Sequence, residues 1–371
     1  MAGKIARRVS LLVTTLAALS LLTVACQGTS PAASSNSKEL TKVKFVTGST
    51  VPQLSVAAQL MAQMVGYMAE EGLDVEIIGS REGTAQVIQL LANGQIDYAS
   101  PAPEVVLVPA GQGRDPELIF FYEVNRKPQV EIAVSPDSPL KDWKEMRGKK
   151  FGVSNIGNAA QKVVEAALKE VGIDPVKEAE FLEIGRAGTA AKAMADKAVD
   201  VLIQTDTEMA TIRETYKTPL RSIAPPARTQ LTFGSSLLTS ISTLKAKREQ
   251  VIGFGRATAK GTIFALENPE ATVRLYWQYI PEQKPKNVSE AEAMKLSLIE
   301  LRSRLDKSVL DGPNDRWGFF KAEQLDAELD FLDLKGKLQP EKYFTNELID
   351  EINKFDANKV REFARSYKVP S

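Results

Sequence analysis

A short sequence pattern occurs twice in this chain of 371 residues, each time between an apolar segment of strand length and a segment with helical periodicity. The pattern is Arg-Glu-Gly-Thr at 81–84 and Arg-Ala-Gly-Thr at 186–189. An acidic residue marks the next apolar segment in both places, Asp97 and Asp200, 16 and 14 positions after the arginine. Four-residue matches also arise by chance, but the shared context favours one unit used twice. The pattern therefore predicts two similarly built α/β halves.

Short apolar segments alternate with longer segments of helical period, which is typical of parallel sheets flanked by helices. We expect strands at 43–47, 75–78, 96–99, 118–122, 150–153, 179–184 and 199–203. We expect helices at 55–70, 84–92, 159–170 and 188–195 and, in the C-terminal third, at 245–266, 269–279, 290–306, 321–332 and 346–367.

Two further apolar segments, 130–134 and 236–241, suit chain crossings between two lobes. The chain is also longer than one hydrophobic core usually organises. We predict lobe one at 41–130 plus 238–371 and lobe two at 131–237, joined by two hinge crossings. The helical C-terminal extension is expected to cover lobe one.

The N-terminus has the order of a secretory signal: basic residues at positions 4, 7 and 8, an apolar stretch at 9–24, then Ala25 and Cys26. The apolar stretch is short for a membrane span, so we predict a signal peptide at 1–25 that is removed. Leu-Thr-Val-Ala-Cys at 22–26 resembles the lipobox of bacterial lipoproteins, which implies lipidation of Cys26. The alternative is an ordinary cleaved signal followed by an unpaired cysteine, the only one in the chain.

The segment that follows Cys26 is rich in glycine, serine and other residues that bury little surface, so we predict a flexible tether at 26–40. Two acyl chains would hold such a protein stably at a bilayer. The mature protein is therefore expected to be anchored on the outer face of the cytoplasmic membrane.

Composition argues against several function classes. The chain contains no histidine, the side chain most used for acid–base work near neutral pH and the commonest metal ligand. Loss of the signal leaves 44 basic against 47 acidic residues, which gives no positive surface for nucleic acid. Phosphate-loop, nucleophile-elbow and dinucleotide motifs are absent from the sequence. We therefore expect no nucleic-acid partner, no cofactor and no metal, although carboxylate chemistry stays open.

In an open α/β sheet, ligands bind beyond the carboxyl ends of the strands, where loops lead into helix N-termini. The loops at these positions are rich in glycine, hydroxyl and amide side chains, which suit recognition of a small molecule. The predicted ligand-binding residues are Gly48, Ser49, Thr50, Arg81, Gly83, Thr84, Ser100, Pro101, Glu104, Tyr122, Asn125, Asn155, Gly157, Asn158, Arg186, Thr189, Gln204 and Asp206.

Arg81 and Arg186 are the most specific of these predictions. If the repeat is real, the two guanidinium groups face each other across the cleft and bind a carboxylate, sulfonate or phosphate from both sides. The alternative is that each pairs locally, Arg81 with Glu82 for example. Tyr122 is a candidate for stacking on a flat ligand, and Glu104 and Asp206 for meeting a ligand amine or capping a helix.

Four segments together resemble one known family, at 71–77, 91–99, 138–153 and 268–271. They are similar to the solute-binding proteins of bacterial ABC importers, in the group for alkanesulfonates, nitrate, riboflavin and the thiamine pyrimidine precursor. The resemblance implies the type II periplasmic-binding-protein fold, a small organic solute held between two lobes, and delivery to the membrane permease subunits without a chemical step. We expect a monomer.

Two alternatives to transport remain. The same superfamily includes a thiamine-pyrimidine synthase that consumes its own histidine, which this chain lacks. A receptor that signals to a membrane protein would use the same cleft as a transport protein.

Overall fold

The computed structural model describes residues 39–370. The predicted signal peptide at 1–25, Cys26 and nearly all of the predicted tether lie outside the described residues. Among the helices of residues 39–370, none combines the length and the hydropathy needed to cross a bilayer. In the same residues, no group of three or more acidic, histidine or cysteine side chains is placed to hold a metal ion.

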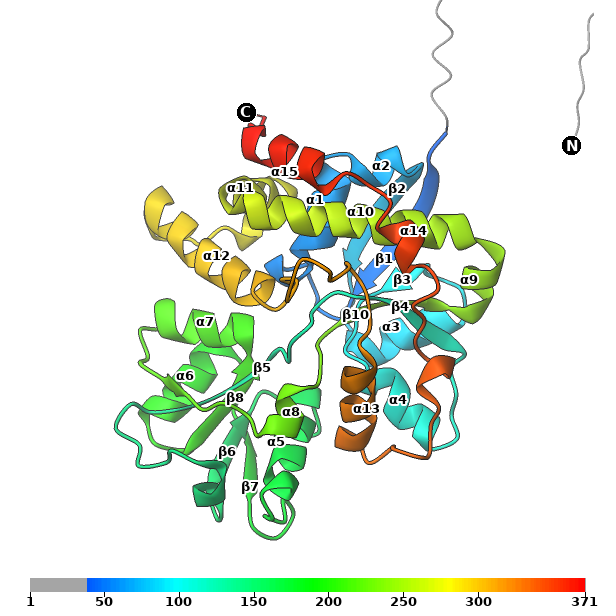
Figure 1. Cartoon of the computed structure of the whole chain (residues 1–371). Helices are drawn as coiled ribbons and strands as arrows, with labels where there is room; N and C mark the ends of the chain where they lie inside the picture. Colours follow the sequence, from blue (N-terminus) through cyan, green and yellow to red (C-terminus); the bar gives the residue numbers. More distant parts are fainter. Residues whose placement is uncertain (1–38, 371) are drawn as a thin grey trace, which may run out of the picture. The chain divides into compact units, whose positions relative to one another are not determined.

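The first sheet has five strands in the order β2-β1-β3-β10-β4 (Figure 1). Their bounds are β1 Thr41–Thr47, β2 Leu73–Gly79, β3 Tyr98–Ala99, β4 Leu118–Glu123 and β10 Ser236–Ser240. β1 is parallel to β2 and β3, whereas β10 is antiparallel to β3 and β4. The register pairs Val43 with Val75 and Phe45 with Ile77, so these buried side chains lie on one face.

The second sheet has the order β7-β6-β8-β5-β9. Its bounds are β5 Val130–Val134, β6 Lys150–Val153, β7 Glu180–Glu183, β8 Val201–Thr205 and β9 Arg221–Ser222. β6 is parallel to β7 and β8, and β5 is antiparallel to β8 and β9. Both sheets therefore contain three parallel strands followed by one antiparallel strand and an edge strand.

The two acidic residues that mark the repeat have the same role in the two sheets. Asp97 Oδ2 accepts a hydrogen bond from Lys44 N at 2.9 Å, in the middle of β1. Asp200 Oδ2 accepts one from Lys150 N at 2.9 Å, at the start of β6. The prediction of two similarly built halves is confirmed by this match and by the strand order.

The helices that connect the strands begin at the expected loops. They are α3 Gly83–Ala92, α4 Glu104–Gly111, α5 Ala159–Glu170, α6 Ala187–Ala195, α7 Asp206–Glu214 and α8 Ala227–Gln230, with the short 3-10 helix η2 at Trp143–Met146. The expected strands and helices are largely confirmed, with ends shifted by a few residues.

Two of the predicted helices are interrupted. The helix expected at 55–70 consists of η1 Leu54–Val56, α1 Ala57–Met64 and α2 Tyr67–Glu70. Gly66 separates α1 from α2 because its φ of 93° is incompatible with a continuing right-handed helix. The helix expected at 346–367 consists of α14 Ile349–Ile352 and α15 Ala357–Ser366, and Asp356 begins the second by accepting from Asn358 N and Lys359 N.

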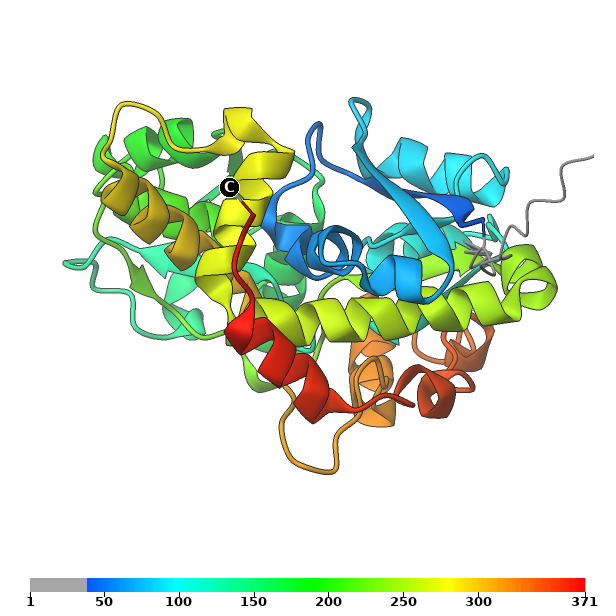
Figure 2. The ribbon, with the colours of Figure 1, turned by 90° about the horizontal axis from the view of Figure 1, so that it is seen from above.

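The remaining C-terminal elements are α9 Ile241–Ala246, α10 Arg248–Glu267, α11 Pro269–Tyr279, η3 Pro281–Gln283, α12 Glu290–Leu305, α13 Ala322–Phe331 and η4 Pro340–Lys342. The long helix α10 packs against α1, α2 and α15 beside the first sheet, as Figure 2 shows for α10 and α15. Phe254 of α10 stacks on Tyr98 of β3 with ring centroids 4.1 Å apart. These contacts agree with the expectation that C-terminal helices cover the first sheet.

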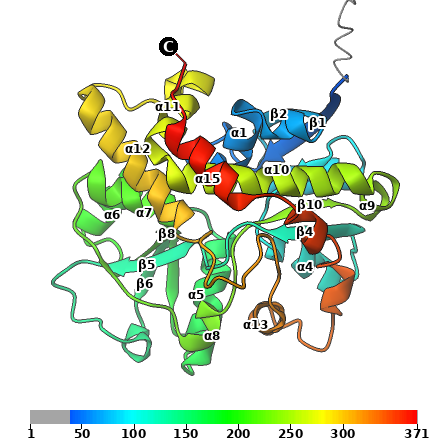
Figure 3. The ribbon, with the colours of Figure 1, turned by 45° about the horizontal axis from the view of Figure 1, so that its top comes forward.

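The C-terminal helices, expected to cover lobe one, also contact the second sheet's half of the chain. Helix α12 packs against α7, and α13 packs against α8, both of which belong to the second sheet's half of the chain (Figure 3). Ser289 Oγ begins α12 by accepting from Glu292 N, and Arg302 and Arg304 occupy its last turn, where cations are favoured by the helix dipole. The C-terminal helices therefore contact both halves.

Candidate functional site

A cavity of about 240 Å³ opens where loops that follow the strands of both sheets meet. The loop after β1, the start of α3 and the loop after β3 line it from the first sheet, and the loops after β7 and β8 line it from the second. The predicted site residues that line this cavity are Gly48, Ser49, Thr84, Ser100, Pro101 and Arg186. We call it the inner cavity.

Close packing shapes the first-sheet side of the inner cavity. A Cβ added to Gly48 would collide with Thr84 Oγ1, so a glycine is needed there for the loop after β1 to approach the start of α3. Ser80 N donates to Thr47 O and Ser49 O, at 3.1 and 2.9 Å, and holds that loop against the end of β2. Ser49 and Thr84 both line the cavity at this wall.

On the second-sheet side, Arg186 pairs with Glu208. The Nη1–Oε1 distance is 3.3 Å and the arginine side chain is 63% exposed, so water screens this pair and it stabilises little. Glu208 also closes a capping box at the start of α7: its carboxylate accepts from Thr205 N, and Thr205 Oγ1 accepts from Glu208 N. The carboxylate is thus bound to its own helix, whereas the guanidinium is free to turn toward a ligand.

The inner cavity also contains a buried arginine that belongs to α12. Arg304 Nη2 lies 2.6 Å from Asp206 Oδ1, and its Nε lies 3.1 Å from Oδ2. The two side chains are only 8% and 4% exposed. Asp206 is the first residue of α7, and its backbone N donates to Gln129 O in the segment that joins β4 to β5. The pair therefore connects the C-terminal helices to the second sheet beside the cavity.

Asn125, Gln204 and Tyr122, which were predicted to bind the ligand, do not line the inner cavity, and each is at most 1% exposed. Asn125 donates to Ser308 Oγ and accepts from Ser235 Oγ, both at 2.8 Å, and so joins the chain crossings to the C-terminal segment. Gln204 Nε2 donates to Gly185 O at 3.1 Å. Tyr122 packs in the core against Gly318, where a Cβ would collide with the ring.

Other predicted residues lie on the surface or at helix starts outside the inner cavity. Arg81 is exposed and does not meet Arg186 there. Asp206 does not line the cavity but forms an ion pair with Arg304, which does. Asn158 begins α5 by accepting from Gln161 N at 2.8 Å, and Thr189 Oγ1 donates to Arg186 O at 3.0 Å. The remaining residues outside this lining are Thr50, Gly83, Glu104, Asn155 and Gly157.

Glu104 and Gly157 line a second, outer cavity of about 480 Å³ between α4 and α5. Burial raises the pKa of Glu104 to about 7. Its neighbour Glu328, on α13, is only 2% exposed, and its Oε2 has no hydrogen-bond partner within residues 39–370. Burial first, and then the charge of Glu104, raises the pKa of Glu328 well above its ordinary value. Two carboxyl groups with raised pKa values therefore lie close to each other, and one of them, Glu104, lines this cavity.

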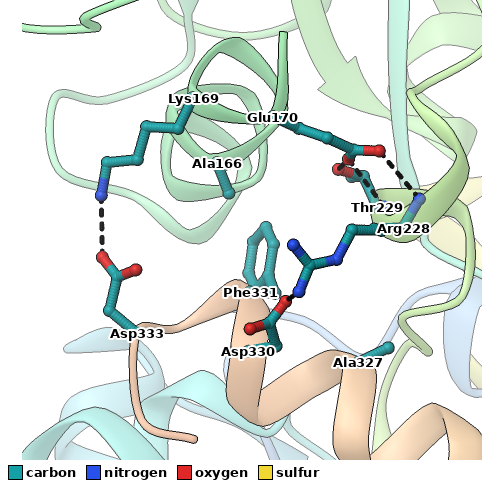
Figure 4. A pocket seen from close by; sticks show the side chains of 9 residues that line it. All are labelled: Ala166, Lys169, Glu170, Arg228, Thr229, Ala327, Asp330, Phe331 and Asp333. Carbon is teal, nitrogen blue, oxygen red and sulfur yellow. Dashed lines mark hydrogen bonds and ion pairs between the residues drawn. The ribbon is translucent and has the colours of Figure 1, made fainter. Parts of the chain in front are cut away.

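A smaller cavity of about 190 Å³ separates α13 from α5 and α8 and is bridged by ion pairs (Figure 4). Lys169 Nζ lies 2.8 Å from Asp333 Oδ2 on one side, and Arg228 pairs with Asp330 on the other. Glu170 accepts from Arg228 N and from Thr229 Oγ1, at 3.1 and 3.2 Å. Since these ion pairs are exposed, they link α13 to the second sheet's half only weakly.

Glu123 lies at the end of β4, where the chain leaves the first sheet, and is 2% exposed. Burial raises its pKa to about 8, although Arg126, whose Nη1 is 3.5 Å from Oε2, lowers it. Between about pH 4.5, which is the ordinary pKa of a glutamate, and about pH 8, the folded state therefore keeps a proton on Glu123 that the unfolded state has released. The free energy of unfolding should fall as the pH rises from about 4.5 to about 8.

The variant Glu123→Gln, which stays neutral, should lose much less stability over that pH range. Urea unfolding of wild type and variant at about pH 5 and about pH 8 measures the difference. Equal loss in the two proteins would show that Glu123 is ionised in the folded state.

Several residues of the inner cavity were not predicted from the sequence, namely Gln53, Ser55, Gln129, Thr205, Thr207, Glu208, Ser235 and Arg304. Thr205 and Thr207 belong to the predicted loop after β8. Gln129 and Ser235 lie in the two crossings, which were treated only as connections. Arg304 has no local signal, because a basic residue in the last turn of a helix is ordinary.

The chain is similar in sequence to one protein family and to two named binding proteins. The model of the family described as NMT1/THI5 like matches residues 53–272, more than half of the chain. YtlA, a Bacillus subtilis protein named as a binding protein, is 28% identical over 152 residues, which are 41% of this chain and 45% of that protein. The formylaminopyrimidine-binding protein of Halalkalibacterium halodurans is 24% identical over 276 residues, 72% of this chain and 78% of the relative.

A solved structure, the periplasmic aliphatic sulphonate binding protein SsuA from Escherichia coli, superposes with a TM-score of 0.57. It is 17% identical and covers 81% of this chain and 89% of its own, so the likeness concerns the fold. It confirms the expected α/β, two-lobed type II periplasmic-binding-protein fold. On the match over residues 53–272, this chain belongs to the NMT1/THI5-like family.

Proposed function

We propose that this protein is the extracytoplasmic solute-binding component of an ABC importer. It captures a small organic solute in the inner cavity and delivers the solute unchanged to the membrane permease subunits. The observation that carries the proposal is a polar cavity lined by strand-end loops from both sheets. The names of YtlA, the formylaminopyrimidine-binding protein and SsuA support a binding role.

Binding would require both lobes because no single group in the cavity is strong enough alone. Micromolar affinity corresponds to about 8 kcal/mol, whereas one helix N-terminus contributes roughly 0.3 to 2 kcal/mol toward an anion. Lobe one would comprise 41–130 plus 238–371, and lobe two 131–237. The boundary between residues 237 and 238 falls within strand β10, which begins at Ser236. Closure on the solute would bring Arg186 and the hydroxyl groups of Ser49 and Thr84 onto it together.

A thermal-shift screen of the full-length protein tests this function. The screen uses alkanesulfonates, pyrimidine precursors of thiamine and riboflavin, three classes that the family resemblance suggests, together with aromatic acids. A solute that binds only the folded state raises the melting temperature by mass action. One or more of these classes should shift it. No shift by any class, together with turnover of a chromogenic hydrolase panel, would favour an enzyme instead.

The N-terminal anchor has its own prediction. Replacing Cys26 with serine removes the thiol that would receive lipid, so the variant should lose labelling by a radioactive fatty acid and leave the membrane fraction. Ser30→Ala, four residues later, is the matched control and should remain labelled. An unlabelled wild-type protein would show that the signal is an ordinary cleaved one.

A further inference from the structure

Arg304 has hydrogen-bonding capacity that the protein does not use. Its Nε and Nη2 bind Asp206, whereas Nη1 makes no hydrogen bond within residues 39–370. The residue is 7% exposed and lines the inner cavity. A guanidinium fixed along one edge by a carboxylate is rigid, so little conformational entropy would be lost when its other edge binds a solute.

The negative charges near the inner cavity are already engaged. Asp206 does not line the cavity, and its Oδ1 accepts from Thr207 N at 2.8 Å as well as from Arg304. Glu208 lines the cavity, but its Oε2 accepts from Thr205 N and from Thr205 Oγ1 at the start of its own helix. Burial raises the pKa of Glu300, one turn before Arg304, to about 7, so its charge is incomplete near neutral pH.

The groups left for a solute are mostly donors. They are the free edge of Arg304, the exposed guanidinium of Arg186, and hydroxyl groups such as those of Ser49 and Thr84. The N-terminus of helix α3, which starts at this wall, also favours negative charge, an effect that the exposed Glu82 at its N-cap partly offsets. In the part of the chain that the structure describes, no unengaged carboxylate lines the inner cavity to attract a cation.

We propose that Arg304 is a specificity-determining residue of the inner cavity, that Asp206 is its positioning residue, and that the preferred solute carries a deprotonated acidic group. Carboxylate, sulfonate and phosphonate share the chemistry that would be recognised, several acceptor oxygens with a negative charge. This inference rests on the proposed function and narrows its solute classes. Riboflavin and neutral pyrimidines would bind more weakly than organic acids of similar size.

The test compares acids with their neutral isosteres. Isothermal titration of the full-length protein in detergent uses methanesulfonate, benzenesulfonate, benzoate and phenylphosphonate against methanesulfonamide, benzenesulfonamide and benzamide. At least one acid should bind at least about tenfold more tightly than its amide, since a hydrogen bond to a charged group is worth that or more. Arg304→Gln should lower the affinity for that acid by about tenfold or more and leave the amide within about twofold.

Three further variants separate recognition from folding. Arg304→Lys keeps the charge and should restore part of the acid affinity. Asp206→Asn keeps the shape of the side chain that holds Arg304 and should weaken acid binding less than Arg304→Gln does. The double variant Asp206→Asn with Arg304→Gln should bind acids no more weakly than Arg304→Gln alone. Arg302→Gln, an exposed arginine on the same helix, should bind like the wild type. Circular dichroism establishes that each variant is folded before it is titrated.

The inference is overturned if amides bind as tightly as acids, if Arg304→Gln leaves acid affinity unchanged in a folded protein, or if no acid binds. In each case the proposed function still stands as long as a neutral solute shifts the melting temperature in the wider screen. Absence of binding by every solute class would overturn both.

Discussion

Replacing Asp206 with alanine should lower the free energy of unfolding by about 3 to 5 kcal/mol, because the change leaves the Arg304 guanidinium buried without its partner. Both side chains are less than a tenth exposed, so water cannot substitute for the lost carboxylate. The effect should be large even though the pair itself stabilises the fold little compared with apolar residues of the same volume. Urea unfolding followed by circular dichroism measures it.

A second variant tests whether the unpaired charge of Arg304 causes the loss of stability. Asp206→Ala combined with Arg304→Met removes both charges and should recover much of the lost stability. Asp306→Ala, an exposed acid two residues after Arg304, should change stability by less than about 0.5 kcal/mol. If Asp206→Ala costs no more than Asp306→Ala, the two side chains are not buried against each other in solution.

Replacing Gly261 with alanine should also destabilise the protein, by about 1 to 3 kcal/mol. Gly261 lies in α10 where this helix crosses α1, and an added Cβ would collide with Ala58 O and lie 2.9 Å from Ala62 N. The obstacle is backbone, so the helices would have to separate. Helix propensity alone would favour alanine over glycine by about 1 kcal/mol, so a loss of stability identifies packing as the cause.

Gly253→Ala is the matched control on the same helix. Its Cβ would meet only the Glu71 side chain, at 3.1 Å or more, which is a much smaller overlap than that with the backbone at Gly261. It should therefore cost less than Gly261→Ala in the same unfolding experiment. Equal stability of the two variants would mean that α10 and α1 are less closely packed than the structure shows.

The α/β arrangement could be predicted because it depends on short-range patterns. Apolar segments of strand length and the paired positions of Asp97 and Asp200 are local in sequence, and both acids accept a hydrogen bond from the backbone N of a lysine in a strand. The break at Gly66 was missed because one glycine in an otherwise helical pattern is often tolerated. The contact of α12 with α7 depends on distant segments, and local periodicity says nothing about it.

The site could be predicted only where its residues follow strands. Arg186 lines the inner cavity as expected, since the loop after β7 ends at the cavity wall. Arg81 occupies the matching place in the repeat yet is exposed and outside the lining, so equivalence in sequence did not give equivalence in space. Arg304 comes from a helix far along the chain, and tertiary packing alone brings it there.

The placement of α12 has a consequence for protein engineering. The matched family segment ends at residue 272, whereas the guanidinium proposed to read the solute's acid group is at residue 304. A chimera that exchanges only the family-matched region between two members would combine the strand-end loops of one protein with the residue that the other protein has at the position of Arg304. Transplanted selectivity should therefore follow the donor only when residues 290–305 are transferred together with α7, the helix they contact.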